Sequence, residues 1–223
     1  MPRPDVSEER REQILDAAGA VFARMGFHDA RMDDIVDHAN LSKGGVYWYF
    51  KSKDELAAAL VERVLARSAG SLRKLLEIDQ PFVERMSLLG QYIAADVRAL
   101  NKLRGVILEF YALAARDAGV RRRVRTYIDE FIELFATMIQ QGIDRGQCKQ
   151  TDPRRTAAVL EATCEGLMIL WLVDTTGFNI DEMADQVTSL FLDALQPATE
   201  ASLNWLPPGG TEPRPKAPPR RRS

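Results

Sequence analysis

A short stretch near the N-terminus, residues 40–53, combines lysines, glycines and aromatic rings in a pattern that suits contact with a polyanion. Its only charged residues are basic, namely Lys43, Lys51 and Lys53. On a helix, residues four apart lie on one line, so Lys43 and Tyr47 share an outward line. Gly44 and Trp48 share the line beside it. Positive charge beside outward rings favours binding to phosphates and bases.

Two consecutive glycines, Gly44 and Gly45, lie in this predicted helix. Each glycine inside a helix costs about 1 kcal/mol relative to alanine. Close approach of another backbone, such as a phosphate chain, is a reason to tolerate that cost. Ser52 and Lys53 begin the following helix, whose free N–H groups suit a phosphate. The stretch therefore predicts a nucleic-acid contact surface.

The aromatic residues of this stretch have an alternative role in the core. That interpretation suits Tyr49 and Phe50, which share a face with Val46 and are expected to pack inward. Tyr47 and Trp48 lie on the opposite side of the helix, where the geometry favours contact with a partner. Scattered surface lysines are usually only solvated, but the lysines here lie beside outward rings, which favours binding.

Hydrophobic periodicity predicts helices almost throughout and no alternating strand. The first three helices are expected at about residues 7–25, 31–39 and 42–49. Ser42 is a good N-cap for the third, and Ser52 with Glu55 forms a capping box that opens a fourth. Short helices separated by a tight turn are typical of a helix-turn-helix. We expect this domain over residues 1–53, with its motif at about 31–50.

Beyond residue 80 the pattern predicts longer helices, at about residues 81–97, 102–116, 120–145, 153–174 and 181–195. The predicted fold class is all-α, with a helical body over residues 54–196 behind the N-terminal head. Gly70 either kinks the fourth helix or is tolerated within it. Residues 197–223 are rich in proline and end in arginines, so we expect a disordered tail there.

The composition indicates an intracellular protein. Of 223 residues, 46% are hydrophobic, which allows a sizeable core. Cys148 and Cys164 are too far apart for a CxxC motif and too few for a disulfide framework, which fits a reducing cytoplasm. The N-terminus has no apolar run and so no secretory signal. The net charge of -2 does not indicate nucleic-acid binding, but that binding depends on a local basic surface.

Neither an enzyme nor a membrane protein is expected. The two histidines, His28 and His38, have no cysteine partner. Asp34 and His38 lie four apart and could hold a metal, but a pair falls short of a three- or four-ligand site. No glycine-rich phosphate loop or nucleophile elbow is present, so no cofactor or metal is expected. The apolar run 157–173 contains two glutamates and is shorter than the roughly 20 residues that a membrane span needs.

The head resembles a known family. The residues Gly26-Phe27, Met32-Asp33-Asp34-Ile35 and Ser42-Lys43-Gly44-Gly45-Val46-Tyr47-Trp48-Tyr49-Phe50-Lys51-Ser52-Lys53-Asp54-Glu55-Leu56 are similar to the N-terminal domain of the tetracycline-repressor (TetR) family, over roughly residues 8–60. The resemblance implies that the helix from position 42 enters the major groove of duplex DNA. The implied DNA contacts are Arg31, Ser42, Lys43, Gly44, Gly45, Tyr47, Trp48 and Lys53.

Two departures from the family pattern affect these contacts. Ala30 and Arg31 stand where the family often has a threonine or serine that contacts phosphate. Arg31 is expected to replace that contact by charge, and Asp29 to replace the helix cap. Gly45 and Val46 replace the more usual threonine and leucine, which leaves the operator sequence open.

The resemblance also implies a ligand-binding and dimerisation role for the antiparallel helices of the body. Residues 157–173 are apolar almost all round, and a helix of that kind must be covered on every side. TetR-like proteins dimerise through their last two helices as a four-helix bundle; a monomeric helical core is the alternative. The expected interface residues are Ala162, Gly166, Ile169, Met183, Val187 and Phe191. Two-fold symmetry would hold two recognition helices one DNA turn apart on a near-palindromic operator.

The middle helices carry aromatic and methionine side chains at spacings that are more often core than pocket. The resemblance favours a pocket, because the family binds small effectors between these helices. The expected lining is Tyr92, Phe110, Tyr111, Phe131, Phe135, Met138, Met168 and Trp171. This lining predicts a largely apolar effector. Acidic residues lie near the same faces, and a cationic or hydrogen-bond-donating ligand would gain if one of them lines the cavity: Asp96, Glu109, Glu161 and Glu165.

The predicted function is a ligand-responsive transcriptional regulator that binds its operator as a homodimer. Repression is the usual mode in the family. A ligand that prefers the conformation with displaced recognition helices must weaken DNA binding, typically by 1–3 kcal/mol of coupling. The alternative is a helical dimeric protein-interaction module without specific DNA binding, which would not explain the outward Tyr47 and Trp48.

Overall fold

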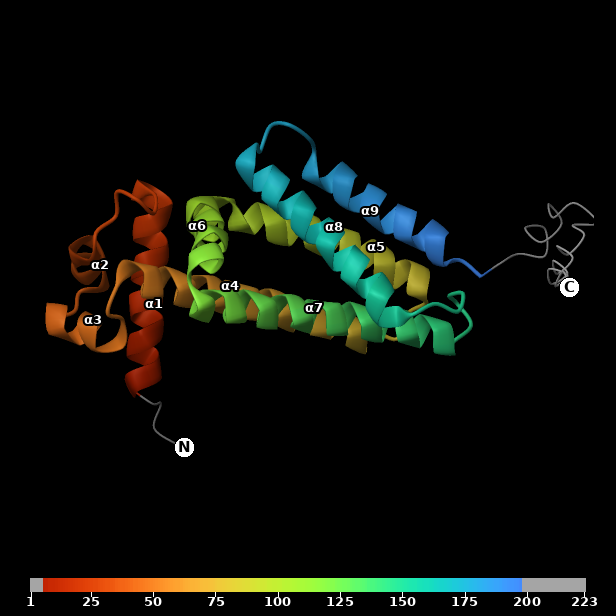
Figure 1. Ribbon diagram of the computed structural model, residues 1–223, viewed down its shortest axis with the longest axis horizontal. Coiled ribbons are helices and arrows are strands. Elements are labelled where there is room, and N and C mark those ends of the chain that lie inside the picture. The colour runs from red at the N-terminus through yellow and green to blue at the C-terminus, as the bar shows by residue number, and fades with distance from the viewer. Residues whose placement is uncertain (1–5, 198–223) are drawn as a thin grey trace, which may run out of the picture.

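The computed structural model describes residues 6–197 and contains helices but no strand over that range (Figure 1). The elements are α1 (Val6–Met25), α2 (Met32–Ala39), α3 (Lys43–Tyr49), α4 (Lys53–Glu77), α5 (Phe82–Leu100), the 3-10 turn η1 (Asn101–Leu103), α6 (Arg104–Arg116), α7 (Ala118–Asp144), α8 (Pro153–Val173) and α9 (Ile180–Leu195). The predicted all-α fold is confirmed. The predicted tail, apart from Pro197, lies outside the described residues.

The three N-terminal helices form a head at one end of the molecule (Figure 1). Ile14, Ile35 and Val46, one from each helix, are fully buried and give the head its own apolar core. The tight turn before α3 passes through Asn40, whose backbone is left-handed with φ 53°. Gly26, with φ 79°, follows the last residue of α1, because glycine adopts this conformation without a steric penalty.

The body consists of antiparallel helices behind the head. α5 packs along α9, α7 packs along α8, and α4 runs from the head alongside α7 (Figure 1). α4 continues through Gly70, so that glycine is tolerated within the helix. Pro81 is the N-cap of α5 instead of its first residue. The segment predicted as one helix over 102–116 begins with the turn η1 and continues as α6.

α8 is long and apolar enough to cross a membrane by these two measures alone, and 44% of its most apolar window is buried inside the protein. The helix packs against α7 and α9, and it carries Glu161 in a fully internal position. These features are those of a core helix with one uncovered face.

Candidate nucleic-acid interface and internal cavity

The outward face of α3 carries Trp48, which is 67% exposed although tryptophan is a large apolar residue. Val46 and Phe50 on the opposite face are buried, as predicted. Tyr47 is half-buried, and so is Tyr49, which was expected to pack inward. Because the Tyr49 hydroxyl bonds to Ser7 at 3.5 Å, that ring stays at the edge of the core.

Lys43 begins this face and is paired within the head. Its ammonium lies 2.7 Å from Asp33 Oδ1 of α2 and 5.9 Å from the centre of the Tyr47 ring. The hydrogen bond from Lys43 to Asp33, and the charge of that carboxylate, raise the pKa of Lys43. The lysine is therefore fully charged near neutral pH, and an incoming phosphate must compete with an exposed carboxylate for it.

The two glycines of α3 have different surroundings. A Cβ added at Gly44 would meet nothing within 4 Å, whereas one at Gly45 would lie 3.2 Å from Ser42 Oγ. Ser42 Oγ also accepts the backbone N–H of Gly45 at 3.1 Å. Within residues 6–197 no side chain packs against position 44, so packing does not explain the glycine there. The position is open toward solvent.

Lys53, which was expected at a phosphate, is partly exposed and is bonded within the head. Its ammonium donates to the carbonyl oxygens of Phe27 at 2.6 Å, His28 at 3.0 Å and Ala30 at 2.9 Å. The three protons of the ammonium are thereby used, and the Phe27 ring lies beneath it at 4.5 Å. Lys53 instead fixes the turn between α1 and α2 to the start of α4.

Replacing Lys53 with methionine should therefore destabilise the head. Bonds from a charged donor contribute about 1.5–3 kcal/mol each at most, and partial exposure of Lys53 reduces the expected loss to about 2 kcal/mol in total. Denaturant unfolding followed by circular dichroism measures this loss. Lys74→Met, at an exposed position near the other end of α4, is the matched control and should change stability little; equal losses in both variants would contradict the assignment.

The start of α2 also differs from the prediction. Asp34, rather than Asp29, completes the cap, because its Oδ2 accepts the backbone N–H of Arg31 at 2.8 Å. Arg31 is exposed at the N-terminus of α2. Ser52 caps α4 by accepting the N–H of Glu55 at 3.1 Å, and Glu55 in turn accepts the N–H of Lys51 at 2.7 Å. The predicted capping box is thus present with its second bond shifted by one residue.

A small internal cavity of about 50 Å³ lies within the body, between α5, α7 and α8. Four of the predicted ligand-binding residues line it: Tyr92, Phe131, Phe135 and Met168. The other four do not: Phe110, Met138 and Trp171 are buried in the surrounding core, and Tyr111 is half-buried away from the cavity. The burial of Phe110, Met138 and Trp171 favours the core interpretation for these three residues.

The lining includes residues that sequence analysis did not place there, among them Tyr127 and Cys164. It also includes three of the four acidic residues singled out from the sequence, namely Asp96, Glu161 and Glu165. Glu109, the fourth, pairs with Arg116 at 2.7 Å away from the cavity. The signal for Tyr127 was its spacing of four residues from Phe131, which puts both rings on one face of α7.

Burial changes the protonation of these acids. Glu161 is 3% exposed, and one carboxylate oxygen of Glu161 and one of Glu165, the Oε1 atom in each, have no hydrogen-bond partner. Loss of hydration raises the pKa of Glu161 to about 7 and that of Glu165 to about 7. Both side chains therefore exchange a proton near neutral pH.

Asp96 is held by a hydrogen-bond network between α4 and α5. The Ser68 hydroxyl lies 2.9 Å from each Asp96 oxygen, and the Tyr92 hydroxyl donates to the Ser68 carbonyl at 2.7 Å. Burial raises the pKa of Asp96, and the Ser68 bond opposes that rise. The Tyr127 hydroxyl reaches Glu165 Oε2 at 3.4 Å from the other side.

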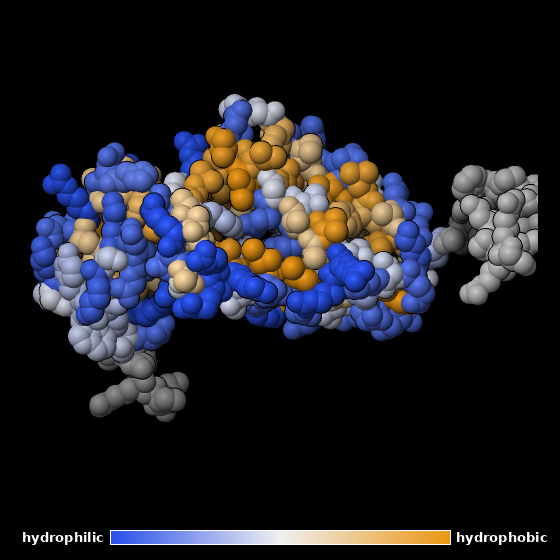
Figure 2. Space-filling view, viewed as in Figure 1, coloured by the Kyte–Doolittle hydropathy of each residue, from blue (hydrophilic) through white to orange (hydrophobic). Residues whose placement is uncertain are grey.

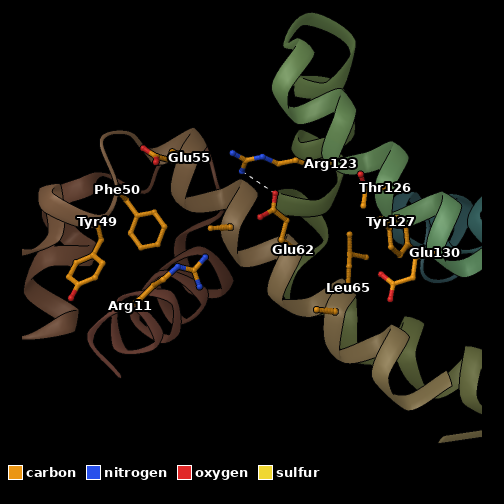
Figure 3. Close-up of a pocket in the computed structure, with 12 residues that line it drawn as sticks. Arg11, Tyr49, Phe50, Glu55, Glu62, Leu65, Arg123, Thr126, Tyr127 and Glu130 are labelled. Atoms are coloured by element: carbon orange, nitrogen blue, oxygen red, sulfur yellow. Dashed lines mark ion pairs between the residues drawn. The ribbon is translucent and has the colours of Figure 1, made fainter. Parts of the chain in front are cut away.

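A second hollow, a groove of about 590 Å³, lies at the surface where the head meets the body (Figure 3). Arg11, Tyr49 and Phe50 line it from the head, and Leu65 and Tyr127 line it from α4 and α7. Figure 3 also shows the ion pair across it, between Glu62 of α4 and Arg123 of α7, at 3.0 Å. Tyr127 lines both this groove and the internal cavity.

The outer face of α8 and α9 is unusually apolar (Figure 2). Its exposed large side chains are Val159, Leu170, Val173, Met183 and Leu190. Of the residues expected at an interface, Ala162 and Met183 are exposed, and Gly166, Ile169 and Phe191 are half-buried. Val187 is only 6% exposed because it faces the core of its own subunit, so its assignment to the interface was wrong.

No group of three or more histidine, cysteine, aspartate and glutamate side chains within residues 6–197 is arranged to hold a metal ion.

Comparison with known proteins relates both halves of the chain to one group. The family model of bacterial regulatory proteins of the tetR family matches residues 14–60. The model of the C-terminal domain of BetI-type transcriptional repressors matches residues 86–197. The chain is 31% identical over 151 residues to YfiR of Bacillus subtilis, an uncharacterized HTH-type transcriptional regulator, with coverage of 68% of this chain and 74% of that relative.

Solved structures share the fold. A TetR transcription regulator from Haloarcula marismortui has a TM-score of 0.74 and 22% identity, covering 85% of this chain and all 100% of its own. A transcriptional regulator from Saccharomonospora viridis, solved in complex with choline, has a TM-score of 0.73 and 21% identity, covering 86% and 100%. With family models matching head and body alike, this chain belongs to the TetR family of bacterial transcriptional regulators.

Proposed function

We propose that the protein is a ligand-responsive regulator that binds a near-palindromic operator as a homodimer in the cytoplasm, most simply as a repressor. The observation that carries the proposal is the exposed Trp48 on a helix whose other face is firmly buried, because a recognition helix inserts such a face into the major groove. The proposed DNA contacts are Arg31, Ser42, Lys43, Gly44, Gly45, Tyr47 and Trp48. The DNA-binding head is assigned to residues 1–53, and ligand binding and dimerisation to residues 54–196.

The homodimer is supported by the apolar face of α8 and α9. Contiguous exposed apolar surface of this kind indicates an interaction site, and a two-fold arrangement would cover the face with its own copy. Two heads would then present their α3 helices about 34–36 Å apart, one turn of DNA. The proposed interface contains the exposed residues Val159, Leu170, Val173, Met183 and Leu190, with Ala162, Gly166, Ile169 and Phe191 beside them.

Release by an effector is proposed to act through α4. This helix begins in the head at Lys53 and also lines the groove, where Glu62 pairs with Arg123 of α7. A ligand that moves α7 against α4 would therefore displace the head, and DNA and ligand would weaken each other's binding by the same factor. The Saccharomonospora viridis regulator was solved in complex with choline, which supports binding of a small molecule by a protein of this fold.

Selection of bound duplexes from a random DNA pool tests the proposal. We expect a two-fold symmetric site with half-sites one turn apart, bound with an affinity that falls steeply between low and moderate salt. Recovery of no enriched sequence, together with binding that is insensitive to salt, would contradict it and favour the interaction module.

Gly44→Ala tests the close approach of α3 to DNA. Open space around Gly44 means that alanine should not harm the fold and should stabilise α3 by up to about 1 kcal/mol. The same methyl group should weaken operator binding by roughly 10-fold, since a backbone or base then meets it. Fluorescence anisotropy with a labelled operator and thermal unfolding give both values.

Gly70→Ala is the matched control, because a Cβ at Gly70 in α4 also meets nothing within 4 Å. It should raise stability similarly and leave operator affinity unchanged. If Gly44→Ala bound the operator as tightly as the native protein, DNA would not approach this part of α3 closely.

A further inference from the structure

The internal cavity carries acidic groups without a basic partner. Its lining comes from α5, α7 and α8 and contains no lysine, arginine or histidine. The titratable groups that face it are Tyr92 and Asp96 from α5, Tyr127 from α7, and Glu161, Cys164 and Glu165 from α8. Ser68 of α4 contributes only its hydroxyl, to Asp96.

Two of these acids have unused binding capacity. Glu161 is almost completely buried, and neither its Oε1 atom nor that of Glu165 has a hydrogen-bond partner. Nearly all buried polar atoms in native proteins have a hydrogen-bond partner, so two buried carboxylate oxygens without one require an explanation. Glu161 and Glu165 lie four residues apart on α8, which puts both carboxyl groups on one side of the cavity.

Aromatic rings complete the lining. The Tyr127 ring lies 4.7 Å from that of Phe131, and the Phe131 ring lies 6.3 Å from that of Phe135. The faces of such rings attract a cation, most strongly where water is excluded. Carboxylates and ring faces together favour positive charge, whereas an anionic or purely apolar ligand would leave the acids unpaired.

We propose that the cavity binds an organic cation, an amine or quaternary ammonium with an apolar body, whose charged nitrogen lies beside Glu161 and Glu165. This inference rests on the proposed function only in naming that cation as the effector; the binding site stands without it. The effector is thus cationic rather than simply apolar.

The position of Tyr127 determines how such a ligand fits. A cavity of about 50 Å³ accommodates a small charged group and little more. Movement of the Tyr127 ring would join it to the groove of about 590 Å³, where the apolar body can lie against Leu65. The groove reaches the head at Phe50, so occupation of this path would press on the region where α4 joins the head.

Binding of the cation should release protons. A positive charge beside the two carboxyls favours their ionised forms, and both groups titrate near neutral pH because of burial. The affinity for a permanently charged quaternary ammonium should therefore increase from pH 6 to pH 8. The affinity for an uncharged molecule of the same shape should not follow this trend.

Isothermal titration calorimetry of the full-length protein without DNA tests the site directly. The probes are benzyltrimethylammonium and neopentylbenzene, its neutral isostere with carbon in place of the charged nitrogen. We expect the cation to bind at least 10-fold more tightly than the isostere at pH 8. We expect the double variant Glu161→Gln/Glu165→Gln to lose that preference, while Glu84→Gln, at an exposed position on α5, retains it. A helical circular dichroism spectrum and a cooperative thermal transition like those of the native protein confirm that the double variant is folded.

Equal affinity for the two probes in the native protein, or an unchanged preference in the folded double variant, would overturn the site. If the cation binds as expected but does not release the operator, the binding site stands and the effector role in the proposed function fails.

Discussion

Replacing Leu170 with glutamate is expected to dissociate the proposed homodimer and to lower operator affinity by at least about 100-fold. Leu170 is 63% exposed in the subunit, so a charged side chain there leaves the fold of the subunit intact. In a two-fold interface the change introduces two carboxylates at once, and burying an unpaired charge is costly. A monomer reads a single half-site and loses the gain from binding both halves together.

Val83→Glu is the matched control for Leu170→Glu. Val83 of α5 is a similarly exposed apolar residue, at 57%, but it lies outside the proposed interface. Sedimentation equilibrium reports the oligomeric state, and anisotropy with a labelled operator reports the affinity. A variant Leu170→Glu that remained dimeric and bound the operator normally would move the interface to another surface.

Folding stability is expected to fall as pH rises from about 4.5 to about 7, because of the two buried glutamates. Burial raises the pKa of each from 4.5 to about 7. Below pH 4.5 the carboxyl is protonated in the folded and the unfolded chain, and its stabilising contribution is complete. Between pH 4.5 and about pH 7 only the unfolded chain ionises, so the stabilising contribution of the protonated carboxyl is lost. Above about pH 7 the carboxyl is ionised in both states, and the free energy of unfolding changes no further because of it.

The size of this effect is on the order of 3 kcal/mol for Glu161, since each unit of pKa shift corresponds to about 1.36 kcal/mol. Urea unfolding at a series of pH values measures it. Because other groups titrate as well, we compare the free energy of unfolding of Glu161→Gln with that of the native protein at each pH. The variant should become increasingly more stable than the native protein as pH rises to 7. For Glu84→Gln, the difference in the free energy of unfolding from the native protein should not change with pH. A flat difference for Glu161→Gln would show that its carboxyl is hydrated in the folded protein.

Much of the head could be predicted from sequence because its determinants are local. The spacing of Val46 and Phe50 fixes the buried side of α3, and the same spacing fixes Trp48 on the opposite side. Caps act over three or four residues, so Ser42 and Ser52 identified the starts of α3 and α4. These predictions needed no knowledge of what packs against the helix.

The partners of side chains could not be predicted in this way. Lys53 was expected at a phosphate, yet it binds carbonyl groups more than twenty residues away, and nothing near Lys53 in sequence indicates them. Val187 was expected at a subunit interface, but it faces its own core. An apolar stripe indicates that a helix face is covered, and it does not specify by which neighbour.

The sequence by itself determined the helices, the outward face of α3 and the presence of acids near the apolar faces of the body. Only the tertiary structure decided that Glu161 and Glu165 share a cavity with Tyr127, while Phe110 and Trp171 belong to the core. The physical reason is the separation in sequence over which each interaction acts. Helix periodicity and capping arise within a few residues, whereas a cavity exists where helices distant in sequence fail to fill the space between them.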